Sequence, residues 1–368
     1  MLEMKRTIAM LLSLMMCVSL LAGCGVAPAP SNAPASAAAS AAQPAPEPAE
    51  QAAPAAPAAS AADAVPTGDK PIALLIPSPV GDPFIALCVK GLEKLSAETG
   101  AELKIIETLD KAEYEDQVRA MAELGANPVY CMWGDLSELA VKVAPEYPNT
   151  KFILADVYMK TNQPNVSSIS VDPYASSFIT GYIAANNTQV KKVGFIAHAD
   201  RPVSRRYRDG FIAGVHYVDE SIPVEVAYVG NDQDPVKGQE VAKLMIQNNG
   251  VDLIFQSASR SGLGVIAGCA DQGIKCIGSD DWQGDVDPCV FWSALKPFDE
   301  ALYVEGKSVF DGTYESGDKA YGLEQGLPMY DQRDFDKLPE ELQQGVLKVV
   351  EGIKSGEIQI TEDENVVQ

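Results

Sequence analysis

From about residue 70 onward, short apolar runs alternate with stretches of helical periodicity almost without a break. The runs are about five to seven residues long and are bounded by polar or turn residues, which is typical of buried strands. Strands that alternate with helices predict parallel strands joined by helices, in a sheet that is covered on both faces. We therefore expect an α/β fold.

The alternation falls into two series, and this predicts two lobes, each a parallel sheet flanked by helices. The residues beyond the first 68 are enough for two such lobes. The predicted strands are 71–77, 101–107, 128–133, 151–156 and 166–171 in the first series, and 191–197, 223–229, 251–256, 275–279 and 290–296 in the second. The predicted helices are about 84–98, 114–124, 136–143, 176–187, 204–218, 235–249, 264–272 and 299–310, with one more within 338–358. We expect lobe 1 to comprise 69–171 and about 297–318, and lobe 2 to comprise 172–296 and about 319–368.

The first residues have the features of a secretory signal peptide. Lys5 and Arg6 form a basic region, and Thr7–Ala22 carries no charge and is too short to span a membrane. The run ends in LAGC, Leu21–Cys24, which resembles a lipobox. We expect residues 1–23 to be removed and Cys24 to be lipidated and hold the protein at the membrane. The alternative is an ordinary signal peptide with a chance cysteine.

Residues 25–68 are mostly alanine and proline and contain no aromatic residue. Such a segment buries too little apolar surface to fold, and its prolines interrupt helices. We interpret residues 24–68 as an extended tether between the lipid anchor and the folded part.

Charge and cysteine content exclude several classes of protein. The formal net charge of −23 argues against nucleic acid as a partner, because binding to nucleic acid requires a basic surface. The five cysteines beyond the tether lie mostly in apolar runs and are expected to be buried thiols; they are Cys88, Cys131, Cys269, Cys276 and Cys289. No metal site or cofactor is expected, since the only histidines are His198 and His216 and no C-x-x-C is present.

Carboxylates and aromatic residues gather where the predicted strands end. Ligands of open parallel sheets bind outside the carboxyl ends of the strands. The residues that follow the strands include Asp82, Phe84, Trp133, Asp135, Asp156, Tyr158, His198, Asp200, Arg201, Tyr207, Asn231, Ser259, Arg260, Asp280, Asp281, Trp282 and Lys296. Aromatic faces hold a planar ring, and carboxylates accept hydrogen bonds from vicinal hydroxyls or ring N–H groups. The combination suits a nucleoside or a sugar.

A glycine-bearing loop follows the strand 251–256 and leads into a helix. Its spacing, G-x-G-x-x-x-G from Gly262 to Gly268, is one residue longer than the dinucleotide fingerprint. A second interpretation is that the glycines permit close helix packing. The third interpretation, which we favour, is that the N–H groups at the start of the helix line a cleft and bind a neutral polar ligand.

Residues 193–215, VGFIAHADRPVSRRYRDGFIAGV, resemble a segment of the basic membrane protein family that reads V-G-F-(I/V), then P-V, an aromatic residue and G-F-x-A-G-V. The resemblance extends through residues 237–266, through IGSDDWQ and WSALKPFDEALY, and through YPNTKFILAD and SFITGYIAA in the first series. It covers most of 70–330. It implies a two-lobe fold of the type I periplasmic-binding-protein kind. It also implies an extracytoplasmic substrate-binding lipoprotein of an ABC importer, of the purine-nucleoside receptor type.

The resemblance also implies site residues. The ribose-binding carboxylates of the family fall on Asp156 and Asp280, and its lysine falls on Lys296. Its stacking aromatics fall on Phe84 and Tyr207, which we expect to sandwich a planar ring, with Asp82 as an acceptor at the edge of the base. The expected ligand-binding set is completed by Trp133, Ser259, Arg260 and Trp282.

Three segments depart from the family pattern. The first loop, VGDPFIAL, is shorter and is similar to the N-P-F loop of ribose-type sugar receptors. Arg260 stands at a family glycine, and Trp282 stands where a second acid is common. The ligand could therefore be a sugar, a free base or a nucleotide.

Each site residue also has a structural interpretation. Asp156 and Asp280 could be helix caps, and Trp133 could be a residue of the hydrophobic core. Arg260 could be a solvated residue or one that binds an anion. Catalytic motifs of the G-x-S-x-G and H-E-x-x-H types are absent from the sequence, so we expect a monomeric receptor with a permease partner rather than an enzyme. A signalling lipoprotein that presents its bound ligand to a membrane sensor is the alternative.

Overall fold

The computed structural model describes residues 70–360. The predicted signal peptide, Cys24, the tether and the last residues, 361–368, lie outside the described residues, so the expectations for them stay predictions.

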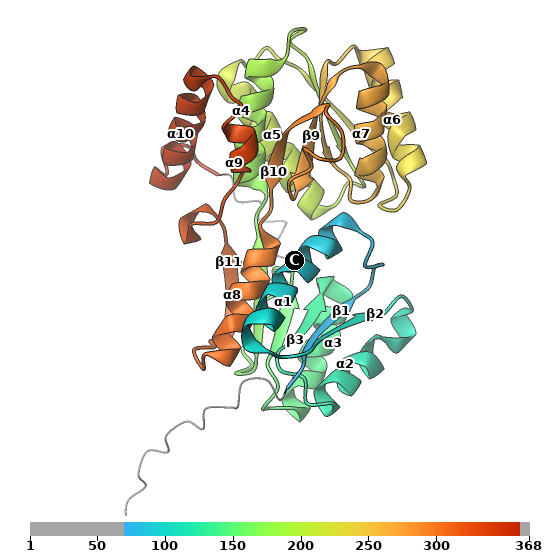
Figure 1. Ribbon diagram of the computed structural model, residues 1–368, viewed down its shortest axis with the longest axis vertical. Coiled ribbons are helices and arrows are strands. Elements are labelled where there is room, and N and C mark those ends of the chain that lie inside the picture. The colour runs from blue at the N-terminus through green and yellow to red at the C-terminus, as the bar shows by residue number, and fades with distance from the viewer. Residues whose placement is uncertain (1–69, 361–368) are drawn as a thin grey trace, which may run out of the picture. The chain divides into compact units, whose positions relative to one another are not determined.

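The described chain contains parallel strands and helices in regular alternation (Figure 1). The strands are β1 (Ile72–Ile76), β2 (Leu103–Glu107), β3 (Val129–Met132), β4 (Phe152–Ala155), β5 (Val166–Val171), β6 (Val193–Ala197), β7 (Val224–Tyr228), β8 (Leu253–Ser257), β9 (Lys275–Asp280), β10 (Val290–Leu295) and β11 (Gly317–Tyr321). The α-helices are α1 (Pro83–Thr99), α2 (Tyr114–Glu123), α3 (Trp133–Val143), α4 (Tyr174–Asn187), α5 (Pro202–Val218), α6 (Pro235–Asn249), α7 (Ser261–Gln272), α8 (Phe298–Phe310), α9 (Gln332–Phe335) and α10 (Glu340–Ser355). Short 3₁₀ helices are η1 (Lys111–Glu113), η2 (Ala144–Glu146) and η3 (Leu323–Gln325).

The strands form two sheets, and all neighbouring strands are parallel. One sheet has six strands in the order β11-β5-β4-β3-β1-β2, and the other has five in the order β10-β9-β8-β6-β7. The α/β fold class with two helix-flanked parallel sheets is confirmed. In each sheet the strand order reverses at one point, between β1 and β3 and between β6 and β8, and such points are where open α/β sheets bind ligands.

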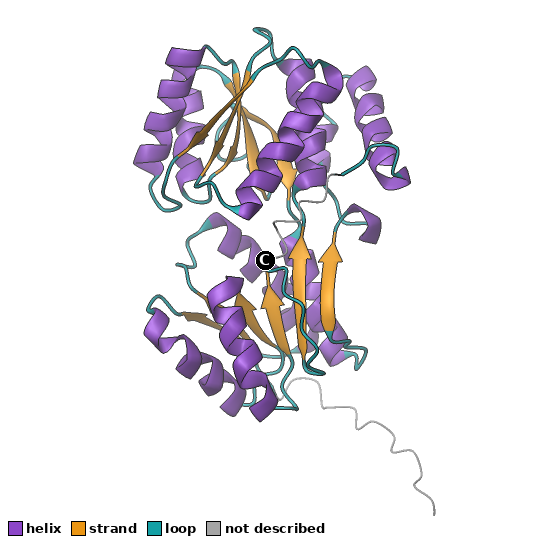
Figure 2. Ribbon diagram, turned by 180° about the vertical axis from the view of Figure 1, so that it is seen from behind, coloured by secondary structure: helices purple, strands orange, loops and turns teal. Residues whose placement is uncertain are grey.

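Helices cover both faces of each sheet (Figure 2). In β1, Ile72, Leu74 and Ile76 pack into the core beneath α1 and α8, whereas Ala73 and Leu75 pack into the core beneath α2 and α3. Because successive side chains of a strand point to opposite faces, a strand covered on both sides must be apolar throughout. In the second sheet, α4, α5 and α10 share one core and α6 and α7 share the other.

The chain passes between the sheets more than once. Helix α8 follows β10 of the five-stranded sheet but packs beside α1, and β11 then joins the six-stranded sheet beside β5 (Figure 1). The chain returns through α9 to α10, which packs in the same core as α4. Strand β11 is not among the predicted strands, and it runs past the expected lobe limit near residue 318.

A buried carboxylate holds β11 in place. Glu305 of α8 accepts hydrogen bonds from Ser167 Oγ at 2.7 Å, Lys319 Nζ at 2.9 Å and Tyr321 Oη at 3.0 Å. Because a buried charge is tolerated only when it is paired, this cluster ties α8, β5 and β11 together.

The cysteines of the described residues are free thiols. Cys88, Cys131, Cys269 and Cys276 are buried, and Cys289 is half-buried. The prediction of buried thiols is confirmed for four of the five.

Helices α4 and α5 approach so closely that only glycine fits at their contact. A Cβ atom on Gly214 would lie 2.0 Å from the carbonyl oxygen of Phe178, and one on Gly181 would lie 2.2 Å from that of Phe211. The backbone cannot move aside easily, because these carbonyl groups are already part of the helices.

We expect Gly214→Ala to lower the free energy of unfolding by about 1–3 kcal/mol, because the added methyl group forces the helices apart. Alanine normally stabilises a helix relative to glycine, so the expected sign is opposite to that of helix propensity. Urea denaturation of the soluble part measures the effect. Gly81→Ala is the control, since a Cβ there meets open space. Equal stability of the two variants would contradict the close approach.

Candidate functional site

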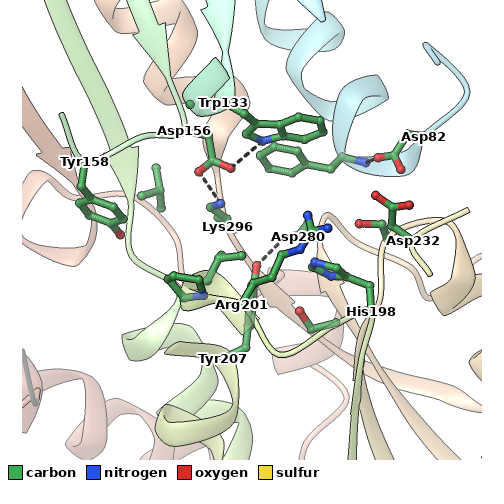
Figure 3. Close-up of a pocket in the computed structure, with 17 residues that line it drawn as sticks. Asp82, Trp133, Asp156, Tyr158, His198, Arg201, Tyr207, Asp232, Asp280 and Lys296 are labelled. Carbon is green, nitrogen blue, oxygen red and sulfur yellow. Dashed lines mark hydrogen bonds and ion pairs between the residues drawn. The ribbon is translucent and has the colours of Figure 1, made fainter. Parts of the chain in front are cut away.

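A cavity of about 390 Å³ lies at the carboxyl ends of the strands and is lined from both sheets (Figure 3). This volume is in the range of small-molecule sites. The lining residues are Asp82, Phe84, Trp133, Gly134, Asp156, Tyr158 and Val171 from the first part of the chain, and His198, Arg201, Pro202, Val203, Tyr207, Asp232, Ser257, Ser259, Asp280 and Lys296 from the second.

The structure brings together eight of the ten residues that the sequence proposes for the site. They are Asp82, Phe84, Trp133, Asp156, Tyr207, Ser259, Asp280 and Lys296. Arg260 and Trp282 do not line the cavity. Arg260 is exposed at the start of α7. Trp282 lies under the guanidinium of Arg333, 3.6 Å from its ring centre, and donates its Nε1–H to Asp334 at 3.1 Å. Its ring therefore supports α9 rather than a ligand in the cavity.

Asp156 and Lys296 form a buried ion pair in the cavity wall. Lys296 Nζ donates to Asp156 Oδ1 at 2.6 Å, and Trp133 Nε1 donates to Asp156 Oδ2 at 3.2 Å (Figure 3). Only 2 % of Lys296 is exposed. The pair fixes one carboxylate and one ammonium side by side, so that acceptors and donors face the same ligand group.

Asp280 is the second carboxylate of this wall. Tyr207 Oη donates to Asp280 Oδ1, and Ser279 Oγ donates to Oδ2 at 3.2 Å. Burial raises the pKa of the Asp280 carboxyl above its ordinary value, and burial also raises the pKa of the Tyr207 phenol. A carboxylate that loses solvation gains more from hydrogen bonds that a ligand hydroxyl donates to it.

The aromatic rings of the site have neighbours other than those expected. Phe84 lies nearly parallel to Trp133, with ring centres 6.5 Å apart, and Lys296 Nζ lies 4.7 Å from the Phe84 ring centre. Tyr207 packs edge-on against Phe255. Both Phe84 and Tyr207 are buried, whereas Trp133 is half-buried. The sandwich of a planar ring by Phe84 and Tyr207 stays a prediction, and Trp133 offers the more accessible face.

Asp82 links the two parts of the cavity. Its Oδ1 accepts from the backbone N–H of Phe84 at 2.9 Å and so caps α1, which is why the helix begins there. Its Oδ2 accepts from Gln233 Nε2 at 3.0 Å. Asp82 thus has a capping role in addition to the expected role of an acceptor at the edge of a base.

Four lining residues stand in the left-handed backbone region, which favours glycine. They are Trp133 with φ of 60°, Asp156 with φ of 60°, Ser259 with φ of 50° and Asp280 with φ of 70°. Asp280 is the last residue of β9, Trp133 and Asp156 directly follow β3 and β4, and Ser259 lies two residues beyond β8. Such conformations in residues other than glycine are uncommon and cluster at functional sites. The strained backbones aim these side chains into the cavity.

Several lining residues do not belong to the ligand-binding set expected from the sequence. His198 and Arg201 follow β6, and Asp232 follows β7, so their place after strands was the available signal. His198 is half-buried, and burial lowers the pKa of its imidazole, with a further contribution from the charge of Arg201. Burial and the neighbouring Arg201 therefore favour the neutral form of the imidazole.

The glycine-bearing loop does not offer the expected N–H groups to a ligand. The backbone N–H groups of Ser261 and Gly262 at the start of α7 donate to the carbonyl oxygens of Asp232 and Ala258. A Cβ atom on Gly264 would lie 1.7 Å from the carbonyl oxygen of Pro235 at the start of α6. The glycines thus serve the close packing of α6 and α7. The end of β8 and the loop line the cavity through Ser257 and Ser259, but the expected role of the N–H groups of Ser261 and Gly262 as donors to a ligand is wrong.

Two parallel sheets whose strand ends share a cavity of carboxylates, a lysine and aromatic rings define a binding protein for a small polar solute. The family model for PnrA-like substrate-binding proteins of ABC transporters matches residues 70–364, and the chain belongs to this family. The family is one of substrate-binding proteins of ABC transporters rather than one of enzymes. Substrate-binding proteins of ABC importers work outside the cytoplasm. Within residues 70–360, no helix combines the length and apolar character needed to cross a membrane.

Relatives carry names that fit this family. The chain is 27% identical over 251 residues to basic membrane protein A2 of Borrelia garinii subsp. bavariensis, covering 66% of this chain and 74% of the relative. It is 28% identical over 156 residues to the ABC transporter nucleoside-binding protein BmpA of Lactococcus lactis subsp. cremoris, covering 42% and 44% of the two chains. It is 26% identical over 248 residues to a purine-binding protein of Brucella abortus, covering 67% and 69%.

Solved structures share the fold. An ABC transporter solute-binding protein from Aeropyrum pernix K1 superposes with a TM-score of 0.67 at 24% identity, covering 80% of this chain and 95% of that one. A transcriptional activator of the comK gene from Bacillus halodurans superposes with a TM-score of 0.68 at 20% identity, covering 78% and 99%.

Proposed function

We propose that this protein is the extracytoplasmic receptor of an ABC importer and binds a purine nucleoside in the cavity. The observation that carries the proposal is the group formed by Asp156, Lys296 and Asp280, next to the ring of Trp133. The relatives called nucleoside-binding and purine-binding support the same ligand class.

The charged group suits a ribose. Vicinal hydroxyls each donate one hydrogen bond and accept another, so they need a carboxylate and a cation within reach of the same two oxygens. Asp156 and Lys296 supply this pair at 2.6 Å from each other, and Asp280 supplies a further acceptor. Asp156 follows β4 of the six-stranded sheet and Asp280 ends β9 of the five-stranded one, so a ribose between them couples binding to closure of the two lobes.

The aromatic wall suits a base. Trp133 is half-buried in the cavity wall, and its Nε1–H is already satisfied by Asp156, so its orientation is fixed. A fixed aromatic face stacks on a purine without losing side-chain entropy on binding.

The remaining parts of the proposal come from the sequence. LAGC at Leu21–Cys24 supports a lipid anchor on the extracytoplasmic face of the membrane, with residues 24–68 as the tether. A monomer that delivers its ligand to a permease is the arrangement we propose.

The test is the substitution Asp280→Asn, read with nucleosides and free bases. Hydrogen bonds to a charged partner contribute about 1.5–3 kcal/mol. We therefore expect Asp280→Asn to weaken binding of a purine ribonucleoside by about tenfold to a hundredfold, and to change the affinity for the free base little. Isothermal titration calorimetry of the soluble part measures both. No variant should turn the nucleoside over.

Asp281→Asn is the matched control. Asp281 is the next residue, is half-exposed, pairs only loosely with Lys90 at 3.7 Å, and does not line the cavity. Since burial disfavours the ionised Asp280, Asp280→Asn is not expected to destabilise the ligand-free protein. An equal loss of affinity for the free base and for the nucleoside would show that Asp280 does not bind the ribose. If the protein binds a sugar and no nucleoside, the proposed ligand is wrong, whereas the proposed role as a receptor stands.

A further inference from the structure

The cavity contains an arginine that the proposed ribose site does not use. Arg201 lines the cavity at the start of α5 and is exposed. Within residues 70–360 its guanidinium has no carboxylate partner. The neighbouring arginines of the same helix differ, since Arg205 pairs with Asp200 at 2.8 Å and Arg208 with Asp209 at 2.7 Å. Arg201 is thus available for a ligand.

The surroundings of Arg201 disfavour an anionic ligand. Asp82 and Asp232 line the same cavity, and Figure 3 shows both on the same side of the view as His198, with Tyr158 on the opposite side. His198 adds no positive charge, because burial lowers the pKa of its imidazole. A phosphate near Arg201 would meet two carboxylates and one cation. A neutral group with both acceptors and donors fits this set better.

We propose that Arg201 selects 6-oxopurine nucleosides, such as inosine and guanosine, over adenosine. This inference rests on the proposed function. A guanidinium presents two parallel N–H groups, and the O6 and N7 atoms of a 6-oxopurine are two adjacent acceptors that match them. The N1–H lies on the other side of O6, on the Watson–Crick edge, and can donate a hydrogen bond to a carboxylate such as Asp232. Adenine carries an amino group in place of O6 and would set N–H against N–H at Arg201.

The test compares three nucleosides and two variants by calorimetry. The wild-type protein is expected to bind inosine and guanosine about 5- to 150-fold more tightly than adenosine, the discrimination of a good bidentate arginine contact. Arg201→Met is expected to remove this preference by weakening the binding of inosine and guanosine without weakening that of adenosine. Arg205→Met is the matched control, because Arg205 lies on the same helix, pairs with Asp200 and does not line the cavity.

The outcomes separate the inference from the function on which it rests. If the wild-type protein binds all three nucleosides equally, or if Arg201→Met keeps the preference, the inference is overturned while the nucleoside receptor stands. If no nucleoside binds, both are overturned. If adenosine monophosphate binds more tightly than adenosine and the gain disappears in Arg201→Met, Arg201 contacts phosphate and the inference is also overturned. Because Arg201 is exposed and the ion pair between Arg205 and Asp200 lies at the surface, both variants are expected to melt as the wild type does, which thermal denaturation checks.

Discussion

Lys296→Met is expected to lower the free energy of unfolding by about 3 kcal/mol and to abolish nucleoside binding. Lys296 is buried, and its Nζ lies 2.6 Å from Asp156 Oδ1 and stands over the ring of Phe84. Without the ammonium group, the carboxylates of Asp156 and Asp280 share a poorly solvated wall with no cation between them. Breaking a buried pair costs about 3–5 kcal/mol, and we take the lower end because both side chains line the cavity rather than the core.

A double substitution separates stability from binding. Lys296→Met with Asp156→Asn removes the unpaired charge and should recover most of the lost stability, while nucleoside binding stays lost. Thermal denaturation should show a drop of roughly 6–12 °C in the melting temperature of the single variant and a partial recovery in the double variant. If Lys296→Met melts within a degree or two of the wild type, the pair does not stabilise the fold.

Cys24→Ala is expected to release the protein from the membrane completely. A single acyl chain gives only marginal binding, and a lipobox cysteine carries at least two chains. Each buried methylene contributes about 0.8 kcal/mol, so removing the chains removes essentially all of the affinity for the membrane. Fractionation of cells into membrane and soluble parts, with detection of the protein in each, measures this.

The chain offers its own control for the anchor. Cys17 lies inside the uncharged run and outside the LAGC tetrapeptide, so Cys17→Ala should stay in the membrane fraction. A Cys24→Ala variant that remains as firmly bound to the membrane as Cys17→Ala would show that the lipobox prediction is wrong.

Most of the fold could be predicted because the strands are covered on both faces. A strand such as Ile72–Ile76 is apolar throughout and stands out in the sequence. Strand β11 was not predicted because Gly317–Tyr321 lies at the edge of the sheet and carries the charged residues Asp318 and Lys319, so it is not an apolar run. Its place depends on Glu305, a partner that lies in the preceding helix and is invisible to periodicity.

The site could be predicted only as far as chain direction determines it. Parallel strands bring their carboxyl ends together, so Asp156, Asp280 and Lys296 were found by position and by family resemblance. The direction of Trp282 depends on the course of one loop, and there the prediction of a cavity residue was wrong. The position of Arg201 after a strand could be predicted, but its role could not, because its lack of a carboxylate partner is a property of the folded chain.

The route of the chain also bears on how a secreted protein of this kind reaches its folded state. The six-stranded sheet begins at Ile72, but its last strand, Gly317–Tyr321, follows all five strands of the other sheet in the sequence. Helix α8, which supplies Phe298 and Leu302 to the core beside α1, arrives equally late. A chain that emerges from its N-terminus therefore leaves an apolar face of the first sheet bare until nearly all of it has crossed the membrane. The half of the protein that is made first is therefore completed last, and its exposed apolar face is prone to aggregation during that interval.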